Sequence, residues 1–210
     1  MLSRRTFLQS TAGLALGAHF CANASTYPPG KYVDVHTHLT HRWGSKGELQ
    51  VAALLSWMDT QEIAQAVVLP LVSPESWDHP ISSDYVLKQT EGHRDRLIPF
   101  CSIDPRSMRI DTPALRRAML EKYRDAGAKG FGEHKPGVAM DDPRNLELFE
   151  VCGELGLPVL LHLDNQRNWD VPGLPALERV LQALPHTIFI GHATGFWSSI
   201  SADVTQEEFA

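Results

Sequence analysis

Two histidines spaced two residues apart, His36 and His38, close a short apolar run near the start of the chain. In an extended strand the side chains alternate between two faces, so both imidazoles point the same way. Neutral imidazole is a common metal ligand, and two such rings at a strand end supply half of a metal site. The alternative is a surface strand that happens to carry histidines, and the pair alone does not separate the two interpretations.

Further histidines and acids stand at the ends of three later apolar runs. Glu133, His134 and Lys135 follow one run, His162 follows the next, and His192 follows the last. A single histidine after a buried strand is most often a polar residue satisfied by its neighbours. Recurrence after several runs instead predicts one shared site, because the carboxyl ends of the strands in a parallel barrel converge on one mouth. Imidazole and carboxylate ligands suit zinc, with manganese or iron as alternatives.

The apolar runs recur every 29 to 33 residues, which is about the length of a strand–helix–strand unit. They are continuously apolar rather than alternating, as expected of parallel strands that are covered on both faces. The runs begin near Val33, Ala66, Leu97, Ala128, Pro158 and Thr187.

Helix signals fill the intervals between the runs. A capping residue followed by proline opens the helices that begin at Pro113 and Pro143, and a glycine closes each of them. Three more helices are predicted over residues 48–62, 83–93 and 175–184. In the helix that begins at Pro113, we expect the sheet to be contacted by the face that carries Leu115, Ala118 and Met119.

Two architectures are built from repeated βα units, the closed eight-stranded barrel and the open doubly wound sheet. A nucleotide-binding doubly wound sheet has a Gly-rich phosphate loop after its first strand, whereas His36-Thr37-His38-Leu39 stands there in this chain. Polar residues at the C-terminal ends of several strands favour the barrel, which builds its site at that end. We therefore predict an α/β fold of the (β/α)8 TIM-barrel type.

Four segments together resemble the amidohydrolase superfamily, in the amidohydrolase-related branch of metal-dependent hydrolases that includes several decarboxylases and lactonases. These segments are Asp34-Val35-His36-Thr37-His38, residues 130–137, Leu161-His162 and Ile190-Gly191-His192. The resemblance covers about residues 31 to 197. It implies a (β/α)8 barrel with a divalent metal held by the HxH pair, by the histidine of the fifth strand and by an aspartate after the eighth strand.

The resemblance also implies roles for individual residues. His36, His38 and His162 carry over as metal ligands. His192 carries over as a ligand of a second metal or as a catalytic histidine.

The fourth strand leaves more than one assignment open. We prefer Glu133 as a metal ligand, because a carboxylate binds metal without modification. Lys135 lies two residues on and therefore faces the same way. It would bind a substrate carboxylate or, like the carboxylated lysine of other branches, bridge two metals. His134 should point the other way and is interpreted as structural.

The sequence supplies about six βα units, whereas the family's barrel has eight. Two more units would take about 60 residues, and the segment from Phe196 to Ala210 lacks the apolar run of a strand. The aspartate expected after an eighth strand, which normally acts as a ligand and a base, has no candidate. We therefore expect residues 25–210 to form a partial barrel that is truncated at its C-terminus, or one that a partner chain completes.

The first 24 residues are predicted to be an export signal. Arg4 and Arg5 lie in a segment that resembles the twin-arginine motif, and residues 12–18 form an apolar run too short to span a bilayer. Ala22-Asn23-Ala24 offers small residues for a cleavage site. We therefore expect a bacterial protein exported to the periplasm, with no membrane anchor once the signal is removed.

Composition narrows the range of partners. A net charge of -6 over 210 residues gives no basic surface for nucleic acid, and 43% hydrophobic residues suffice for a sizeable core. Cys101 and Cys152 lie inside apolar segments and are predicted to be buried small hydrophobes, so a disulfide is not implied. The expected partner is a small-molecule substrate, and a homo-oligomer is left open.

Together these features predict a metal-dependent hydrolase in which a metal-activated water attacks an amide, lactone or ester-like bond. His192 would help to stabilise the oxyanion. A metal-dependent non-oxidative decarboxylase and an inactive metal-binding fragment are the alternatives. Tryptophans near the loops after the strands would line an apolar pocket or pack in the core: Trp43, Trp77, Trp169 and Trp197.

Overall fold

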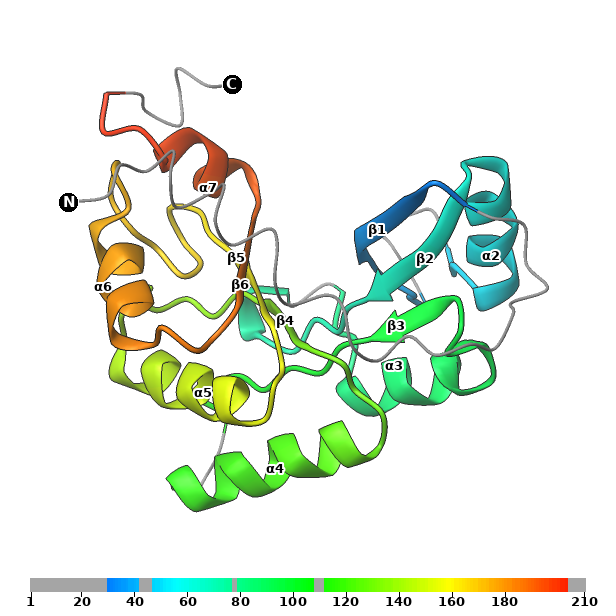
Figure 1. Ribbon diagram of the computed structural model, residues 1–210, viewed down its shortest axis with the longest axis horizontal. Coiled ribbons are helices and arrows are strands. Elements are labelled where there is room, and N and C mark those ends of the chain that lie inside the picture. The colour runs from blue at the N-terminus through cyan, green and yellow to red at the C-terminus, as the bar shows by residue number, and fades with distance from the viewer. Residues whose placement is uncertain (1–29, 42–46, 77–78, 108–111, 204–210) are drawn as a thin grey trace.

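The structure is a computed structural model that describes residues 30–41, 47–76, 79–107 and 112–203. Six strands alternate with helices along the chain (Figure 1), which confirms the α/β fold of TIM-barrel type with six βα units. The predicted export signal and its cleavage site lie outside the described residues. The strands are β1 (Tyr32–Thr37), β2 (Ile63–Val68), β3 (Leu97–Pro99), β4 (Phe131–His134), β5 (Val159–His162) and β6 (Phe189–His192).

Parallel pairing joins the strands in sequence order. β1 pairs with β2 and β2 with β3, while β4 pairs with β5 and β5 with β6. The two three-stranded sheets meet where Cys101, just after β3, bridges Phe131 in parallel. There Cys101 N–H donates to Gly130 O at 2.9 Å and Gly132 N–H donates to Cys101 O at 2.7 Å. Within the described chain β1 and β6 do not pair, so the sheet is curved but not closed.

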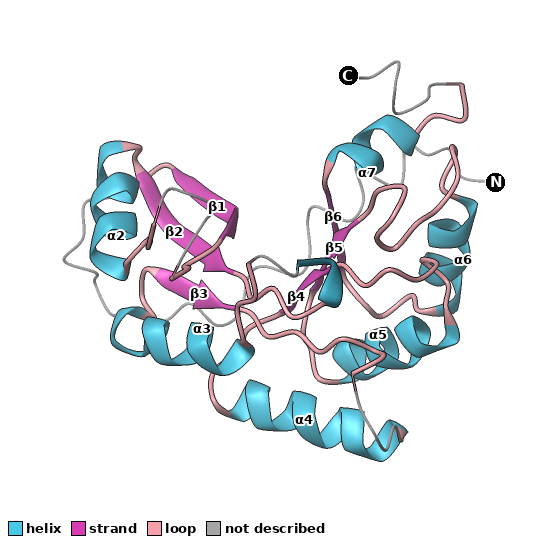
Figure 2. Cartoon of the chain, turned by 180° about the vertical axis from the view of Figure 1, so that it is seen from behind, coloured by secondary structure: helices cyan, strands magenta, loops and turns pink. Residues whose placement is uncertain are grey.

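The helices follow one another around the outside of the strands (Figure 2). The helices that begin at Pro113 and Pro143 have the predicted N-terminal caps. Thr112 accepts a hydrogen bond from Leu115 N–H, and Asp142 accepts one from Arg144 N–H. The sequence pattern does not predict the short helix α7 after β6. The helices are α2 (Val51–Thr60), α3 (Ser83–Thr90), α4 (Pro113–Asp125), α5 (Pro143–Glu154), α6 (Pro175–Ala183) and α7 (Thr194–Ser199), with single 3-10 turns η1 (Pro74–Ser76) and η2 (Glu91–His93).

The predicted inward face of α4 is wrong for Leu115 and Ala118, which are exposed, whereas Met119 packs against the core as expected. Its buried residues are Arg116, Leu120 and Tyr123, whereas the side chain of Leu115 is 41% exposed. The reason is that Arg116 forms an ion pair with Glu147 of α5 and so takes an inward position that an apolar pattern assigns to other residues. The paired charge, together with its apolar stem, makes this burial tolerable.

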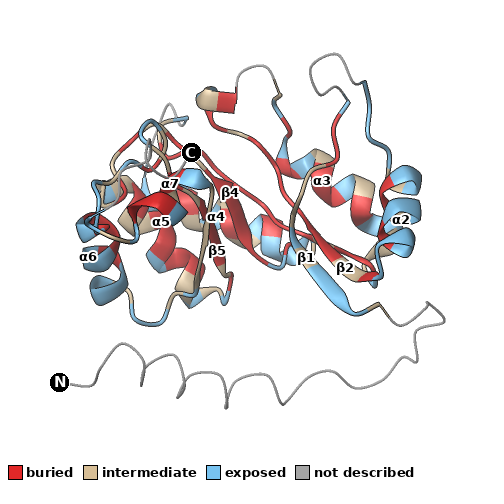
Figure 3. Cartoon of the chain, turned by 90° about the horizontal axis from the view of Figure 1, so that it is seen from above, coloured by how far each residue is buried: buried red, intermediate tan, exposed pale blue. Residues whose placement is uncertain are grey.

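Apolar side chains cover both faces of β2 to β5, which are largely buried. The prediction of cover on both faces is wrong for β1, because Tyr32, Val33 and Val35 are 60%, 54% and 47% exposed. One side is packed by a small cluster of Val67, Leu69, Phe100 and Leu160, and the other side by the larger clusters beneath the helices. Figure 3 shows buried residues along β2 and β4, and exposed ones along β1 and on the outer sides of α2 and α6. For β2 to β5, burial on both faces explains why the runs are continuously apolar.

The two cysteines of the described chain behave as predicted. Cys101 and Cys152 are fully buried and free, and burial raises the pKa of the Cys101 thiol to about 12. Such a thiol is unreactive at neutral pH. Among the described helices, none is both long enough and apolar enough to cross a membrane.

Candidate metal centre

The ends of β1, β4, β5 and β6 bring polar side chains together around the carboxylate of Glu133. Glu133 Oε2 lies 3.4 Å from His36 Nε2 and 3.2 Å from His38 Nε2. Glu133 Oε1 lies 2.5 Å from His162 Nδ1. The ring of His192 stacks on that of His36 with centroids 3.8 Å apart. The Glu133 side chain is only 2% exposed, so these contacts replace water as its surroundings.

Strand geometry puts both histidines of the HxH pair on this side. Their rings lie 4.8 Å apart, and both present Nε2 to the same Glu133 oxygen, as the alternation of side chains predicts. The backbone N–H of His36 donates to Asp34 Oδ1 at 3.0 Å. His38 Nδ1 donates to the carbonyl of Leu69 at 2.9 Å, and since a carbonyl only accepts, this nitrogen carries the proton. The bond from Nδ1 to Leu69 O fixes the ring of His38 with Nε2 directed into the site.

Glycines before Glu133 and His192 permit the close approach of neighbouring groups. At Gly132 φ is +135°, and a Cβ there would lie 2.5 Å from Leu160 O on β5. At Gly191 a Cβ would lie 2.3 Å from the ring of Phe196 in α7. Any larger residue would push the ends of β4 and β6 away from their neighbours. The glycines in the segments 130–137 and 190–192 thus hold the site residues in place.

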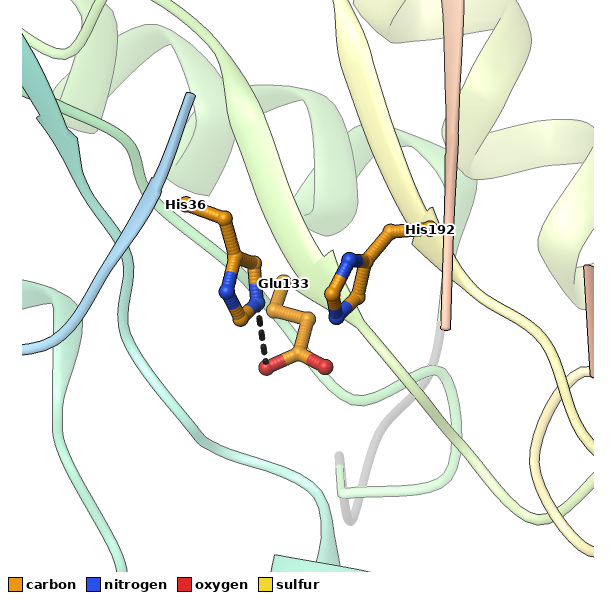
Figure 4. Close-up of side chains that lie close together, drawn as sticks. All are labelled: His36, Glu133 and His192. Atoms are coloured by element: carbon orange, nitrogen blue, oxygen red, sulfur yellow. Dashed lines mark ion pairs between the residues drawn. The ribbon is translucent and has the colours of Figure 1, made fainter. Parts of the chain in front are cut away.

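Three of these side chains form a group that could hold a metal ion. The ligand atoms of His36, Glu133 and His192 lie within 4.8 Å of one another, and they come from three different strands (Figure 4). His36 Nε2 and Glu133 Oε2 are buried, and although they lie 3.4 Å apart as an ion pair, neither makes a hydrogen bond of good geometry within the described residues. Buried polar atoms without partners are costly unless something else satisfies them. Two imidazole nitrogens and a carboxylate match the ligands of a first-row divalent metal.

His162 is held between two carboxylates. Its Nδ1 faces Glu133, and its Nε2 lies 2.9 Å from Asp164 Oδ2. Asp164 is itself fixed, because its carboxylate accepts hydrogen bonds from the backbone N–H groups of Gln166 and Arg167 and from the Arg167 side chain. A carboxylate that holds one nitrogen of an imidazole orients the other nitrogen toward the site. His162 is therefore fixed with Nδ1 directed at Glu133.

The charges in the site shift the pKa values of its members. Burial alone would raise the pKa of Glu133, but the imidazoles of His162, His36 and His38 and the charge of Lys135 hold it well below its usual range. Burial lowers the pKa of His162, but its hydrogen bonds to Asp164 and Glu133 outweigh this effect and raise it above the usual value. Burial and the neighbouring His36 lower the pKa of His192 to about 4. At neutral pH Glu133 is ionised and His192 is neutral, which are the forms that bind metal.

The other two residues at the end of β4, Lys135 and His134, lie on opposite sides of the strand, as predicted. Lys135 Nζ lies 3.3 Å from Glu133 Oε2, on the site's side of the strand. His134 points the other way, is fully buried, and places Nε2 2.8 Å from Asn145 Oδ1. Burial lowers the pKa of His134 to about 4, so it stays neutral. It is a structural residue on the helix-facing side.

Comparison with known proteins identifies the family. A family model described as Amidohydrolase matches residues 33–210. The chain belongs to the amidohydrolase family. A search of curated proteins finds no match to this chain.

Solved structures show the same fold at low sequence identity. An uncharacterized TIM-barrel protein from Bordetella bronchiseptica superposes with a TM-score of 0.57 at 16% identity, over 79% of this chain and 67% of its own. A protein described as a 2-pyrone-4,6-dicarboxylic acid hydrolase from Pseudomonas putida gives 0.53 at 17%, over 78% and 57%. The 2,6-dihydroxybenzoate decarboxylase from Rhizobium gives 0.52 at 14%, over 79% and 67%. The amidohydrolase chain thus spans between about half and two thirds of these structures.

The structure brings together all six residues that the sequence singled out: His36, His38, Glu133, Lys135, His162 and His192. Sequence reasoning missed Asp164, although it follows His162 at the same two-residue spacing that marked the HxH pair. Of the tryptophans, Trp169 and Trp197 are about half exposed and so are not core residues, while Trp43 and Trp77 lie outside the described residues.

Proposed function

We propose that this chain is a divalent-metal-dependent hydrolase that cleaves an amide, lactone or ester-like bond of a small molecule. The observation that carries the proposal is the group of His36, Glu133 and His192, whose nitrogen and oxygen ligand atoms converge within 4.8 Å. The family match agrees with it, since the matched residues include all three. Zinc is the metal we favour, with manganese or iron as alternatives.

The roles of the residues follow from their contacts. His36, Glu133 and His192 would hold the metal, joined by His38 Nε2 and by His162 Nδ1, which both face the same carboxylate. When bound, the metal would supply Lewis acidity, which polarises a carbonyl and makes water acidic enough to react near pH 7.

Proton transfer in the proposed reaction is assigned to His162 and His192. If His162 is not occupied as a metal ligand, its position between two carboxylates lets it hold a proton at either ring nitrogen. Such a group can deliver a proton to a leaving nitrogen or oxygen. Asp164 keeps the ring in that orientation. If His192 is not occupied as a ligand, its neutral ring can donate a hydrogen bond to the developing oxyanion.

Decarboxylation is the second candidate, and Lys135 is the observation that favours it. Its ammonium group is 14% exposed and lies 3.3 Å from Glu133, at the edge of the candidate metal centre. A cation there would bind a substrate carboxylate next to the polarised carbonyl. The Rhizobium neighbour is a decarboxylase, which makes this reaction worth testing in parallel.

One assay separates these reactions. The purified chain is treated with chelator, reloaded with Zn²⁺ or Mn²⁺, and offered aromatic carboxylates, lactones and amides. Metal-dependent product without CO2 supports hydrolysis, and CO2 release supports decarboxylation. Absence of any turnover, with metal bound, would favour the alternative of an inactive metal-binding fragment. The matched controls are Glu133→Gln, expected to abolish turnover, and His93→Ala in η2, expected to retain it.

A further inference from the structure

Two buried amides lie directly behind the site, between the ends of β4 and β5. Asn145 and Asn168 are both 0% exposed. Asn168 Nδ2 donates to His134 O at 2.6 Å and to His162 O at 3.0 Å, so one amide joins the two strand ends. Asn168 Oδ1 accepts a hydrogen bond from Asn145 Nδ2 at 3.0 Å. No part of the proposed chemistry uses either asparagine.

Asn145 connects the end of β4 and Asn168 to the first turn of α5 through hydrogen bonds. Its Oδ1 accepts from His134 Nε2 at 2.8 Å, and its Nδ2 also donates to Ala139 O at 3.1 Å. Asn168 is further fixed by its backbone N–H, which donates to Pro136 O at 2.9 Å. The result is a closed buried network that links the loop after β4, the start of α5 and the loop after β5. The side-chain oxygen and nitrogen of both asparagines have partners, and satisfied buried amides of this kind are rigid.

The strand pairing explains why such a network is needed here. β4 and β5 pair at Phe131 with Val159 and at His134 with Leu161, and the register shifts between these pairs. The ladder is therefore irregular in the stretch between these two pairs, which contains Glu133. Those ends carry Glu133 and His162, whose side chains meet at 2.5 Å. The carbonyls bound by Asn168 belong to His162 itself and to the residue after Glu133.

We propose that Asn168, supported by Asn145, is a positioning residue that sets the distance between Glu133 and His162. The asparagine acts through the backbone of both residues and touches neither reacting group. The consequence for binding rests on the proposed metal-dependent function, because only there does this distance determine ligand geometry. Removal of a group that orients a metal ligand typically lowers the metal affinity about 10- to 100-fold. The same loss is expected for Asn168.

The variant is Asn168→Gly, which removes the amide without penalising the backbone. Asn168 has φ of 45°, a left-handed conformation that glycine adopts freely. Leu120→Ala in α4 is the matched control, because it truncates a fully buried side chain in the apolar cluster beneath the helices. Asn168→Ser, which keeps one donor, replaces the glycine variant if that variant does not fold.

Two readouts are taken at a temperature where all variants are folded. Imidazole ¹⁵N shifts of the metal-free protein report the hydrogen bonds of His162, and Zn²⁺ titration reports the dissociation constant. We expect Asn168→Gly to move the His162 resonances and to weaken Zn²⁺ binding about 10- to 100-fold, whereas Leu120→Ala changes neither. Unchanged His162 resonances in a destabilised Asn168 variant would overturn the proposal, since the residue would then be purely structural. If the wild-type chain binds no metal, the proposed function fails, but the imidazole shifts still decide whether Asn168 positions His162.

Discussion

Replacing Glu133 by glutamine should destabilise the metal-free protein, because it leaves buried positive charges without a counter-ion. The side chain is 2% exposed, and its partners Lys135 and His162 are 14% and 16% exposed. Glutamine has nearly the same shape but no charge, so the change removes the counter-ion and leaves the cations buried. Removal of one partner from a buried ion pair costs about 3–5 kcal/mol. For a chain of this size each kcal/mol shifts Tm by about 2–4 °C, which predicts a fall of about 6–20 °C.

The penalty should depend on pH in a direction that the structure determines. The pKa of His162 is raised in the folded state, so the stabilisation from its protonated form is fully present below its unfolded pKa of about 6.5 and is lost as pH rises through the folded value. The difference in stability between the wild type and Glu133→Gln should therefore be larger at pH 6 than at pH 9.

Thermal unfolding followed by circular dichroism in the presence of chelator measures both effects. The control is Glu62→Gln, the same substitution in a surface pair with Lys31, where the side chains are 56% and 66% exposed. A surface pair of this kind contributes at most about 1 kcal/mol. If Glu133→Gln and Glu62→Gln lower Tm equally, or if the Glu133 effect does not change with pH, the charges around Glu133 are not arranged as described.

The remaining predictions concern a second charge network and the export signal. Arg106→Gln should destabilise the protein by about 3–5 kcal/mol at pH 7, because Asp104, only 1% exposed, would lose its counter-ion. The hydrogen bonds from Arg106 lower the pKa values of Asp104 and Glu75. Their contribution to stability is therefore present above their unfolded pKa values and is lost in acid. Urea unfolding should show that the penalty of Arg106→Gln shrinks from pH 7 to pH 3. Replacement of Arg4 and Arg5 together by lysine should leave the protein in the cytoplasm, and an unchanged periplasmic level on fractionation would argue against a twin-arginine signal.

The strands and helices were predictable because their signals are local. A capping side chain such as Thr112 bonds to an N–H group three residues away, and a glycine ends a helix through its own backbone conformation. Continuous apolar runs at regular spacing identify strands that are covered on both faces. The inward face of α4 was not predictable in this way. It depends on a pairing of Arg116 with Glu147 in another helix, and no periodicity within α4 encodes that partner.

In the candidate site, too, some features follow from local sequence signals and others depend on tertiary contacts. The alternation of a strand suffices to place His36 and His38 on one face and Glu133 and Lys135 on one face, and all four lie at the site. That His162 would be held between Glu133 and Asp164 depends on how the loop after β5 folds back. Asn168 is harder still to foresee, because asparagine is common in loops and only tertiary contacts reveal its role.

The central claim, that strand-end residues form a divalent metal centre, is tested most directly by metal content. Wild-type protein and three single variants, His36→Ala, His192→Ala and His93→Ala, are purified without chelator and analysed by inductively coupled plasma mass spectrometry. His93 lies in η2, apart from the group formed by His36, Glu133 and His192, so its variant controls for the loss of a histidine. The account predicts metal in the wild type and in His93→Ala and sharply reduced metal in the other two. Equal metal content in all four proteins, or none in the wild type, would contradict it.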